Sequence, residues 1–363
     1  MDHKWRNRRL QHLSVAVLTA FLAVFLALAY WTVLRGTALS ERQDNPRRVE
    51  AELRIRRGRI LDSEGAVLAE TVGPLQAPQR VYAVSTIGPA VGYYSFRYGT
   101  AGVEEGFDAI LRGNSESAWR ALWRHSLHEV QRGRDIRLTL NADWQRQASA
   151  LLGERRGAIV LLTLPEGAIA AMASSPGYDP NRLDEQFEDL AGSAGAPLLN
   201  RATQGQYQPG LALQPFLLAG ALDAGLIRLE DDINNADRAI VVHRQSRQCA
   251  TEPPESATWR DVLQHACPAP MLTLGEEMAA SEVESVLASF GLMQAPDVPL
   301  AVSEPPSATI SDVESALIGQ AELTVSPLQV ALALAALANE GAPPAPLLVS
   351  AVQNEQGAWQ SLP

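Results

Sequence analysis

The sequence is poor in several features that would each point to a particular class of protein. It has only two cysteines, Cys249 and Cys267, so at most one disulfide can form. Such a pair joins in an oxidising compartment, but spacing alone leaves open both a disulfide and two buried thiols. No group of histidines and acids has a recognised metal-ligand spacing, and His125, His128 and Glu129 are better explained as a solvated helix face. We therefore expect no metal and no cofactor.

Positive charge is also scarce beyond the first residues. Setting aside Lys4, Arg6, Arg8, Arg9 and Asp2, the chain from residue 35 onward carries a net charge of about −14. Proteins that bind nucleic acid need a basic surface, so nucleic acid is excluded as a partner. The overall composition, 46% hydrophobic and 20% charged, is that of an ordinary globular chain with a packed core.

One long apolar run is present, over residues 13–34. As a helix it is long enough to cross about 30 Å of hydrocarbon. The basic residues 1–12 before it favour a cytoplasmic N-terminus, and Tyr30 and Trp31 suit the far interface. We predict a single-pass cell membrane protein with an extracytoplasmic C-terminal domain. A cleaved signal peptide is the alternative, because residues 27–29 resemble a cleavage site.

The exported chain divides by pattern near residue 135. Residues 35–134 are expected to form a polar linker and a small α+β module, whose first element is a hairpin over residues 57–71 with a turn at residues 63–65. Residues 135–363 are expected to form the larger domain. It begins with a strand, a helix and a buried hairpin laid on that helix, and helical patterns then dominate at 215–225, 258–266, 276–291 and 326–341.

Seven segments in order then carry a resemblance: RGRILDSEGAVLA, GFDAILRG, LTLNADWQRQA, GAIVLLTLPEGAIAAMASSPGYDPN, LLNRATQGQYQPG, ACPAPM and IGQAELTVSPLQVALALAALANEGAPPAP. This succession resembles the class B penicillin-binding proteins over about residues 57–350. The resemblance implies an α+β fold with one transmembrane helix, a non-catalytic pedestal, and a transpeptidase domain in which helices surround an antiparallel sheet. It also implies cross-linking of peptidoglycan stem peptides and acylation by penicillins, through a serine with a lysine three residues on, a Ser-x-Asn element and a Lys-Thr-Gly strand.

The reactive positions of that family are substituted here. In QYQPGLALQPF, Leu211 stands at the serine position and Gln214 at the lysine position, within a preserved frame of neighbouring residues. Leucine has no nucleophilic atom, and glutamine is no base near neutral pH. Ala266 and Pro268 replace the serine and asparagine of the second element, so neither can relay a proton. No Lys-Thr-Gly occurs up to Pro363, and we interpret the chain as degenerate and C-terminally truncated.

The missing third element raises a question about the sheet. Without the strands that follow Lys-Thr-Gly in the family, the hairpin GAIVLLTLPEGAIAAMAS would expose an edge and an apolar face. A partner chain, a replacement hairpin in VSAVQNEQGAWQS, and a decayed gene fragment are three alternatives that the sequence leaves open.

The leading hypothesis is a homologue of peptidoglycan synthesis enzymes without transpeptidase activity, retained as a scaffold or regulatory subunit. Its expected partners are the membrane, other wall-synthesis or division proteins, and peptidoglycan. One alternative is an acyl-transfer enzyme with a relocated nucleophile, for which Ser174, Ser175 and Thr203 are candidates, whereas Ser193 in AGSAG is better explained by a flexible loop. Another is non-covalent binding of peptidoglycan by the vestigial cleft.

Two clusters are given structural interpretations. The aromatics of VGYYSFRYG are expected to pack rather than stack on a ligand. The arginines at 54, 56, 57 and 59 are expected on a solvated strand face, with binding to anionic envelope surfaces as the alternative.

Overall fold

The computed structural model describes residues 3–30, 55–74, 77–113, 131–242, 244–304, 309–320 and 323–362. Residues 3–30 contain the helix α1 (His3–Ala29). Within the residues described, no helix combines the length and the apolarity that a membrane crossing requires. The predicted span over 13–34 therefore stays a prediction. Most of the predicted linker and the group His125, His128 and Glu129 lie outside the described residues.

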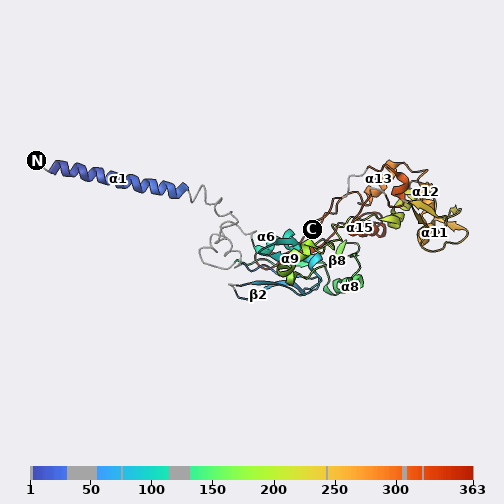
Figure 1. Ribbon diagram of the computed structural model, residues 1–363, viewed down its shortest axis with the longest axis horizontal. Coiled ribbons are helices and arrows are strands. Elements are labelled where there is room, and N and C mark those ends of the chain that lie inside the picture. The colour runs from blue at the N-terminus through green and yellow to red at the C-terminus, as the bar shows by residue number, and fades with distance from the viewer. Residues whose placement is uncertain are drawn as a thin grey trace. The chain divides into compact units, whose positions relative to one another are not determined.

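A six-stranded sheet, whose strand β2 is labelled in Figure 1, gathers strands from both ends of the chain after residue 56, in the order β14-β13-β6-β1-β2-β3. The predicted hairpin is confirmed: β1 pairs antiparallel with β2, and the Asp62 side chain accepts hydrogen bonds from the turn amides of Glu64 and Ala66. The strands are β1 (Ile60–Leu61), β2 (Val67–Val72), β3 (Gln79–Tyr82), β6 (Ile136–Leu138), β13 (Val349–Gln353) and β14 (Trp359–Ser361).

The C-terminal strands answer part of the question about the sheet. A hairpin does form near the C-terminus, since β13 and β14 pair antiparallel. It joins β6 in the six-stranded sheet, however, and not the hairpin of β7 (Gly157–Thr163) and β8 (Ala168–Ser175), which forms a separate two-stranded sheet. The β7–β8 pair is connected to this region by an isolated bridge from Ala168 to Leu347 and by the Thr139 hydroxyl, which donates to the carbonyls of Ile169 and Leu347. Of the alternatives that the sequence left open, a C-terminal hairpin forms, but its partner strand is β6, because edge strands accept any compatible neighbour.

The predicted strand, helix and hairpin after residue 135 are confirmed. Helix α8 (Ala142–Leu152) begins at Asn141, whose side chain accepts hydrogen bonds from the amides of Asp143 and Trp144. It packs on β8, where the buried side chain of Gln145 bonds both the amide and the carbonyl of Met172. Polar groups of the strand are thereby satisfied inside an apolar contact.

The small module after β3 supplies short elements rather than long helices, as predicted. They are α4 (Gly88–Val91), β4 (Gly92–Ser95), β5 (Gly99–Gly102), α5 (Val103–Gly106) and α6 (Asp108–Arg112). The aromatics of this module pack as expected: the Tyr93 ring lies edge-on to Tyr178, and the Tyr98 ring stacks on Phe187 at 3.9 Å between centroids. Phe187 belongs to α9 (Leu183–Gly192), which follows η2 (Pro180–Arg182).

The helical part encloses a second core. Its helices are α10 (Gln214–Asp223), α11 (Trp259–His265), α12 (Ala269–Leu274), α13 (Ala280–Ser289), α14 (Val313–Leu317) and α15 (Pro327–Ala338), with η3 (Gly210–Leu213) before α10. Short strands accompany them: β9 (Asp232–Ile233), β10 (Ile240–Val242), β11 (Gln245–Arg247) and β12 (Ala257–Thr258). Phe216, Leu217, Val262 and Leu287 are fully buried in this core. All four predicted helices occur, and α15 begins with a capping box formed by Ser326 and Gln329.

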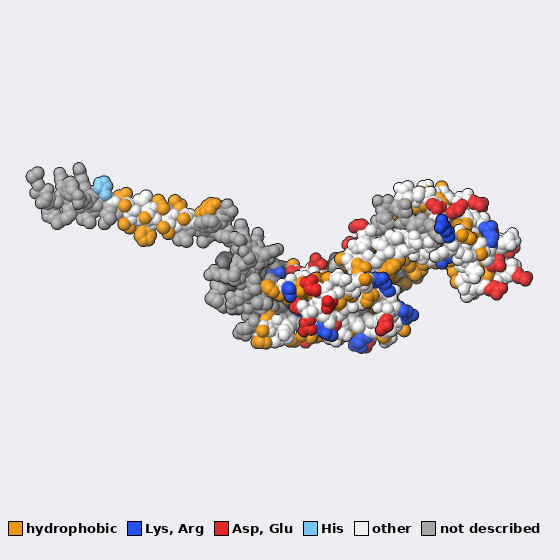
Figure 2. Space-filling view, in the orientation of Figure 1, with side chains coloured by type: hydrophobic (Ala, Val, Ile, Leu, Met, Phe, Trp, Pro, Cys, Tyr) orange, Lys and Arg blue, Asp and Glu red, His pale blue; other side chains and the backbone are white. Residues whose placement is uncertain are grey.

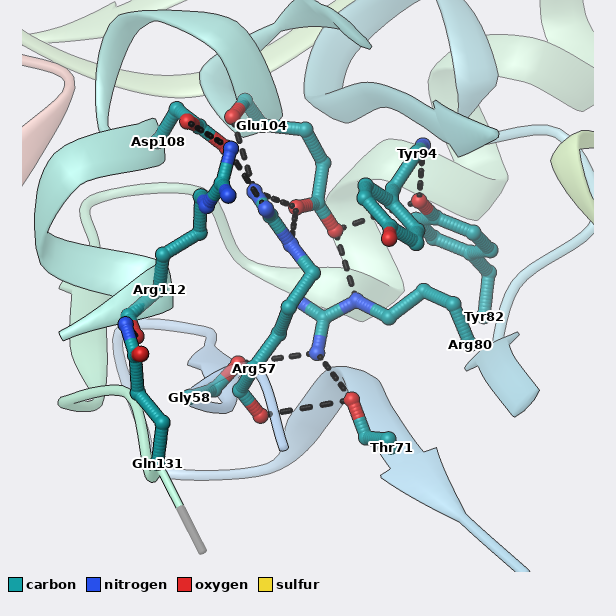
Figure 3. A network of polar contacts seen from close by, with 10 residues as sticks. All are labelled: Arg57, Gly58, Thr71, Arg80, Tyr82, Tyr94, Glu104, Asp108, Arg112 and Gln131. Carbon is teal, nitrogen blue, oxygen red and sulfur yellow. Dashed lines mark hydrogen bonds and ion pairs between the residues drawn. The ribbon is translucent and has the colours of Figure 1, made fainter. Parts of the chain in front are cut away.

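A buried ionic network joins the hairpin to the small module, and Figure 3 shows its arginines on either side of one carboxylate. Glu104, with no exposed surface, accepts from Arg57 Nη2 at 2.8 Å and from Arg80 Nε at 2.6 Å. Tyr82 also donates its hydroxyl to Glu104 at 3.1 Å, and Arg57 reaches Asp108 at 2.6 Å. The expectation of a solvated arginine face is therefore wrong for Arg57, because opposite charges nearby make its burial possible.

The network fixes the charge of Glu104. Burial alone would raise the pKa of this carboxyl, but the facing guanidinium groups of Arg80 and Arg57 outweigh it and hold the pKa below its usual value. A carboxyl whose pKa is lowered by folding contributes stability above its unfolded pKa of about 4.3, and that contribution is lost as the pH falls through the lower folded value.

We predict that Glu104→Gln destabilises the chain by about 3–5 kcal/mol, because two buried guanidinium groups lose their carboxylate. Urea unfolding of the full chain in detergent, followed by circular dichroism, measures the change. Glu230→Gln is the matched control: it breaks the exposed pair with Arg260, which is expected to cost less than about 1 kcal/mol.

The same variant distinguishes the effect of the Glu104 charge on stability from the effect of a general packing defect. Wild type should lose stability between about pH 5 and pH 3, whereas the Glu104→Gln variant should show a weaker dependence over that interval. Equal slopes for the two proteins would contradict the assignment of acid sensitivity to Glu104.

Candidate functional site

The substituted positions Leu211 and Gln214 lie at the entrance to helix α10. Leu211 belongs to the 3-10 turn η3, and Gln214 is the first residue of α10. In a 3-10 turn the residues i and i+3 lie one above the other, so the two positions share a side, as the resemblance requires. Leu211 packs against the helical core, and the side chain of Gln214 is 1% exposed.

The second substituted element meets the first through a hydrogen bond. Gln214 Nε2 donates to the backbone carbonyl of Cys267 at 2.8 Å. Cys267 lies between Ala266 and Pro268, in the loop that links α11 to α12. The structure therefore connects Gln214 of the first element to the loop that carries Ala266 and Pro268, through the backbone of Cys267. The residue type at 267 gave no signal for this contact, because the acceptor is a backbone carbonyl.

A disulfide and the neighbouring helix α11 hold the loop that carries the second element in place. Ala266 ends α11 in the left-handed conformation, with φ at 49°. Cys267 forms a disulfide with Cys249, which resolves the alternative that the sequence left open. At its other end α11 begins with a capping box, in which hydrogen bonds from Thr258 lower the pKa of Asp261.

The frame around Leu211 is held by two further backbone contacts. Tyr207 and Val325 exchange hydrogen bonds of 3.0 and 2.9 Å, and the Gly210 amide donates to the Gly319 carbonyl at 2.9 Å. A Cβ atom added to Gly319 would lie 2.0 Å from the Gly210 carbonyl oxygen, and Gly319 has a positive φ of 64°. Only glycine fits there. The segment Ile318-Gly319-Gln320 thus supports the first element, a role that pattern alone did not reveal.

The four side chains at these positions offer neither a nucleophile nor a base for acyl transfer. Nucleophilic catalysis needs an oxygen or sulfur atom next to a base, whereas the four side chains here are two hydrocarbons, an amide and a proline ring. Lysine, the base of the family's first element, is also nearly absent from the sequence: Lys4 is the only lysine. Both cysteine sulfurs are consumed in the disulfide.

The hydroxyl groups that the sequence offers as alternative nucleophiles each donate a hydrogen bond to a backbone carbonyl. Ser174 Oγ donates to the Leu199 carbonyl at 3.3 Å, Ser175 Oγ donates to Gly153 at 2.8 Å, and Thr203 Oγ1 donates to Ala301 at 2.8 Å. None of these bonds is made to a side chain that could accept a proton as a general base.

Ser193 follows helix α9 as its C-cap, and its hydroxyl accepts from the Gly195 amide at 3.2 Å. This local turn agrees with the loop expected there. Over the described ranges, no group of three or more histidine, cysteine or acidic side chains is placed to hold a metal.

We predict that Gln214→Leu destabilises the protein by about 1–3 kcal/mol, because the buried Cys267 carbonyl loses its donor. Thermal unfolding of the full chain measures the effect. Gln264→Leu, an exposed position on α11, is the control and should change stability by less than about 0.5 kcal/mol. A Gln214→Leu variant as stable as wild type would show that the amide contributes nothing to the loop.

Comparison with known proteins identifies both parts of the chain after residue 56. Residues 157–363, more than half of the chain, match the penicillin binding protein transpeptidase domain, and residues 57–136 match the penicillin binding protein A dimerisation domain. The peptidoglycan D,D-transpeptidase PbpA of Mycolicibacterium smegmatis is 28% identical over 96% of this chain and 76% of its own length. PbpA of Mycobacterium tuberculosis is 29% identical with the same coverage.

Solved structures agree with these relatives. Penicillin-binding protein A from M. tuberculosis, in its imipenem acyl-enzyme complex, superposes with a TM-score of 0.75 at 27% identity, over 86% of this chain and 77% of that one. Another crystal structure of the same M. tuberculosis protein superposes with a TM-score of 0.75 over 85% of this chain. The resemblance noted from the seven sequence segments is thus confirmed: the chain belongs to the penicillin-binding proteins with a transpeptidase domain, as a homologue of the peptidoglycan D,D-transpeptidases.

Proposed function

We propose that this protein is a penicillin-binding-protein homologue without transpeptidase activity, which serves as a scaffold or regulatory subunit of peptidoglycan synthesis at the cell membrane. The observation that carries the proposal is the replacement of nucleophile and base by Leu211 and Gln214 inside an intact frame. Gln214 forms a buried hydrogen bond to the second element, so the substitution is built into the packing.

The magnitude of the expected defect supports the same conclusion. Loss of a catalytic serine typically lowers a hydrolytic rate by about 10⁶-fold, and the remaining members of such a unit contribute little alone. Here the second element is substituted as well, at Ala266 and Pro268. No increase in substrate binding offsets a loss of that size, because tighter binding of substrate and transition state alike does not raise the rate of the chemical step.

A scaffold role follows from what the fold preserves. The region of residues 57–136 keeps a fully buried ionic network, which costs desolvation and is maintained only with all of its partners in place. The mixed acidic and basic side chains over the face seen in Figure 2 suit contacts with other proteins better than with a uniformly charged polymer. Single-pass anchoring by residues 13–34, with the folded part outside, is included in this proposal.

Two other functions make different demands. An acyl-transfer enzyme with a relocated nucleophile needs a hydroxyl beside a base, and Ser174, Ser175 and Thr203 instead bond backbone carbonyls. Non-covalent binding of peptidoglycan is compatible with an inactive cleft and with the scaffold role.

We predict that the full chain in detergent keeps its intact mass after incubation with imipenem, because no activated nucleophile is present at residue 211. Mass spectrometry under denaturing conditions measures the adduct. PbpA of M. tuberculosis, whose imipenem acyl-enzyme complex has been solved, is the positive control. A stoichiometric adduct on the present chain, mapped to any residue, would overturn the proposal that it is inactive.

We also predict that the protein associates with other envelope proteins in its own cells. Cross-linking of a tagged full chain, followed by purification and mass spectrometry, should recover wall-synthesis or division proteins above a control that expresses an unrelated single-pass protein with the same tag. Recovery of the same set as that control would count against the scaffold role while leaving the mass measurement unaffected.

A further inference from the structure

A polar cavity lies away from the substituted catalytic positions. It has a volume of about 380 Å³, and its walls come from the loop after β3, the end of α8, the end of β8, and the η2–α9 segment. The polar side chains that line it include Ser85, Thr86, Ser149, Asp179, Arg182 and Gln186. Small-molecule sites begin at about 300 Å³, so the cavity is large enough for a ligand of one or two rings.

Several of its polar groups have no partner within the protein. Among the described residues, the side chains of Ser85, Thr86, Ser149, Arg182 and Gln186 make no hydrogen bond or ion pair. They present three hydroxyls, one amide and one guanidinium toward a common space, where water or a ligand satisfies them. Hydroxyl and amide groups that remain uncommitted within one concave surface can all take part in recognition.

The floor of the cavity, in contrast, is fixed by hydrogen bonds. Ser175 Oγ donates to the Gly153 carbonyl at 2.8 Å, and the buried Tyr178 hydroxyl donates to Gly88 at 3.0 Å. Burial raises the pKa of Tyr178 far above its usual value, so this hydroxyl stays a neutral donor. The Tyr178 and Leu152 side chains give the floor an apolar component beside the polar walls.

The wall that carries the guanidinium and the amide is also held in place. Asp179 caps η2 by accepting from the Asn181 amide at 2.9 Å. The Asn181 side chain then bonds both the amide and the carbonyl of Tyr82, at 2.8 and 3.0 Å. The start of α9, with Arg182 and Gln186, is therefore tied to strand β3. A cavity whose walls are already positioned loses little entropy when a ligand binds.

We propose that this cavity binds an N-acetylated amino sugar of a glycan strand. A pyranose offers alternating hydroxyl donors and acceptors to the three serine and threonine hydroxyls, and an apolar ring face to Tyr178 and Leu152. The Gln186 amide matches an acetamido group. A carboxylate on the sugar would meet Arg182, the one cationic side chain that lines the cavity. The choice of glycan rests on the proposed function in peptidoglycan synthesis.

The test uses the full chain in detergent and the disaccharide N-acetylglucosaminyl-N-acetylmuramic acid. Saturation-transfer NMR is expected to show contact with the acetamido methyl groups, and titration calorimetry gives the affinity. Arg182→Ala and Gln186→Ala should each weaken binding about tenfold, because each removes one polar contact with the sugar. Thr86→Ala, which removes a single hydroxyl, should weaken it less.

Two control variants test whether a loss of binding is specific to the cavity. Glu185→Ala, on the same helix but outside the lining, and Arg247→Ala, on the exposed hairpin of β10 and β11, should leave binding unchanged. Circular dichroism confirms that each variant is folded. Absence of disaccharide binding, or binding that Arg182→Ala and Gln186→Ala leave intact, would overturn the proposal.

Two further probes separate this inference from the proposed function. A stem pentapeptide without sugar should not compete with the disaccharide, and competition that Arg182→Ala abolishes would assign the cavity to peptide instead. An imipenem adduct together with normal disaccharide binding would refute the proposed inactivity and leave the sugar site standing. An unchanged mass without disaccharide binding would refute the sugar site and leave the proposed inactivity standing.

Discussion

The hydrogen bond from Gln214 to the Cys267 carbonyl is the contact on which the arrangement of the site depends. It replaces an ammonium group by a neutral donor, so the entrance to α10 is buried without the desolvation cost of a charge. The disulfide to Cys249 fixes the acceptor, and the close approach of Gly210 to Gly319 fixes the donor's helix. The loops that would surround a substrate thus pack against one another through backbone and hydrocarbon groups.

The ionic network around Glu104 is the counterpart of this contact in the region of residues 57–136. There charged groups are buried together: Arg57 donates to Glu104 and Asp108, and Arg80 Nη1 donates to the Gly58 carbonyl, while the buried Arg80 Nη2 atom has no hydrogen-bond partner among the described residues. The two contacts differ in kind, because the one at Gln214 uses a neutral amide whereas the one around Glu104 buries charges.

Local patterns predicted much of this fold from the sequence. The turn at Gly65, the helical pattern over 326–341 and the hairpin of β7 and β8 are all short-range features, and each element formed where expected. The spacing of Leu211 and Gln214 also placed both on one side of a turn. Long-range choices were beyond such reasoning. The pairing of β13 with β6, the burial of Arg57, and the acceptor of the Gln214 amide each depend on residues more than forty positions away, and no local propensity records them.

The pairing of β13 with β6 also has a consequence for how the chain matures. Ser350 bonds the carbonyl of Arg137 across a sequence separation of 213 residues, and β6 in turn lies beside β1. A chain that emerges from its N-terminal end can form the β1–β2 hairpin at once, but the sheet lacks its outer pair until residue 361 has appeared. Non-local pairing of this kind makes folding slow, because a long loop must close before any contact rewards it. Premature release, or a chaperone that holds the intervening helices apart, would therefore leave the β6 edge of the sheet unpaired.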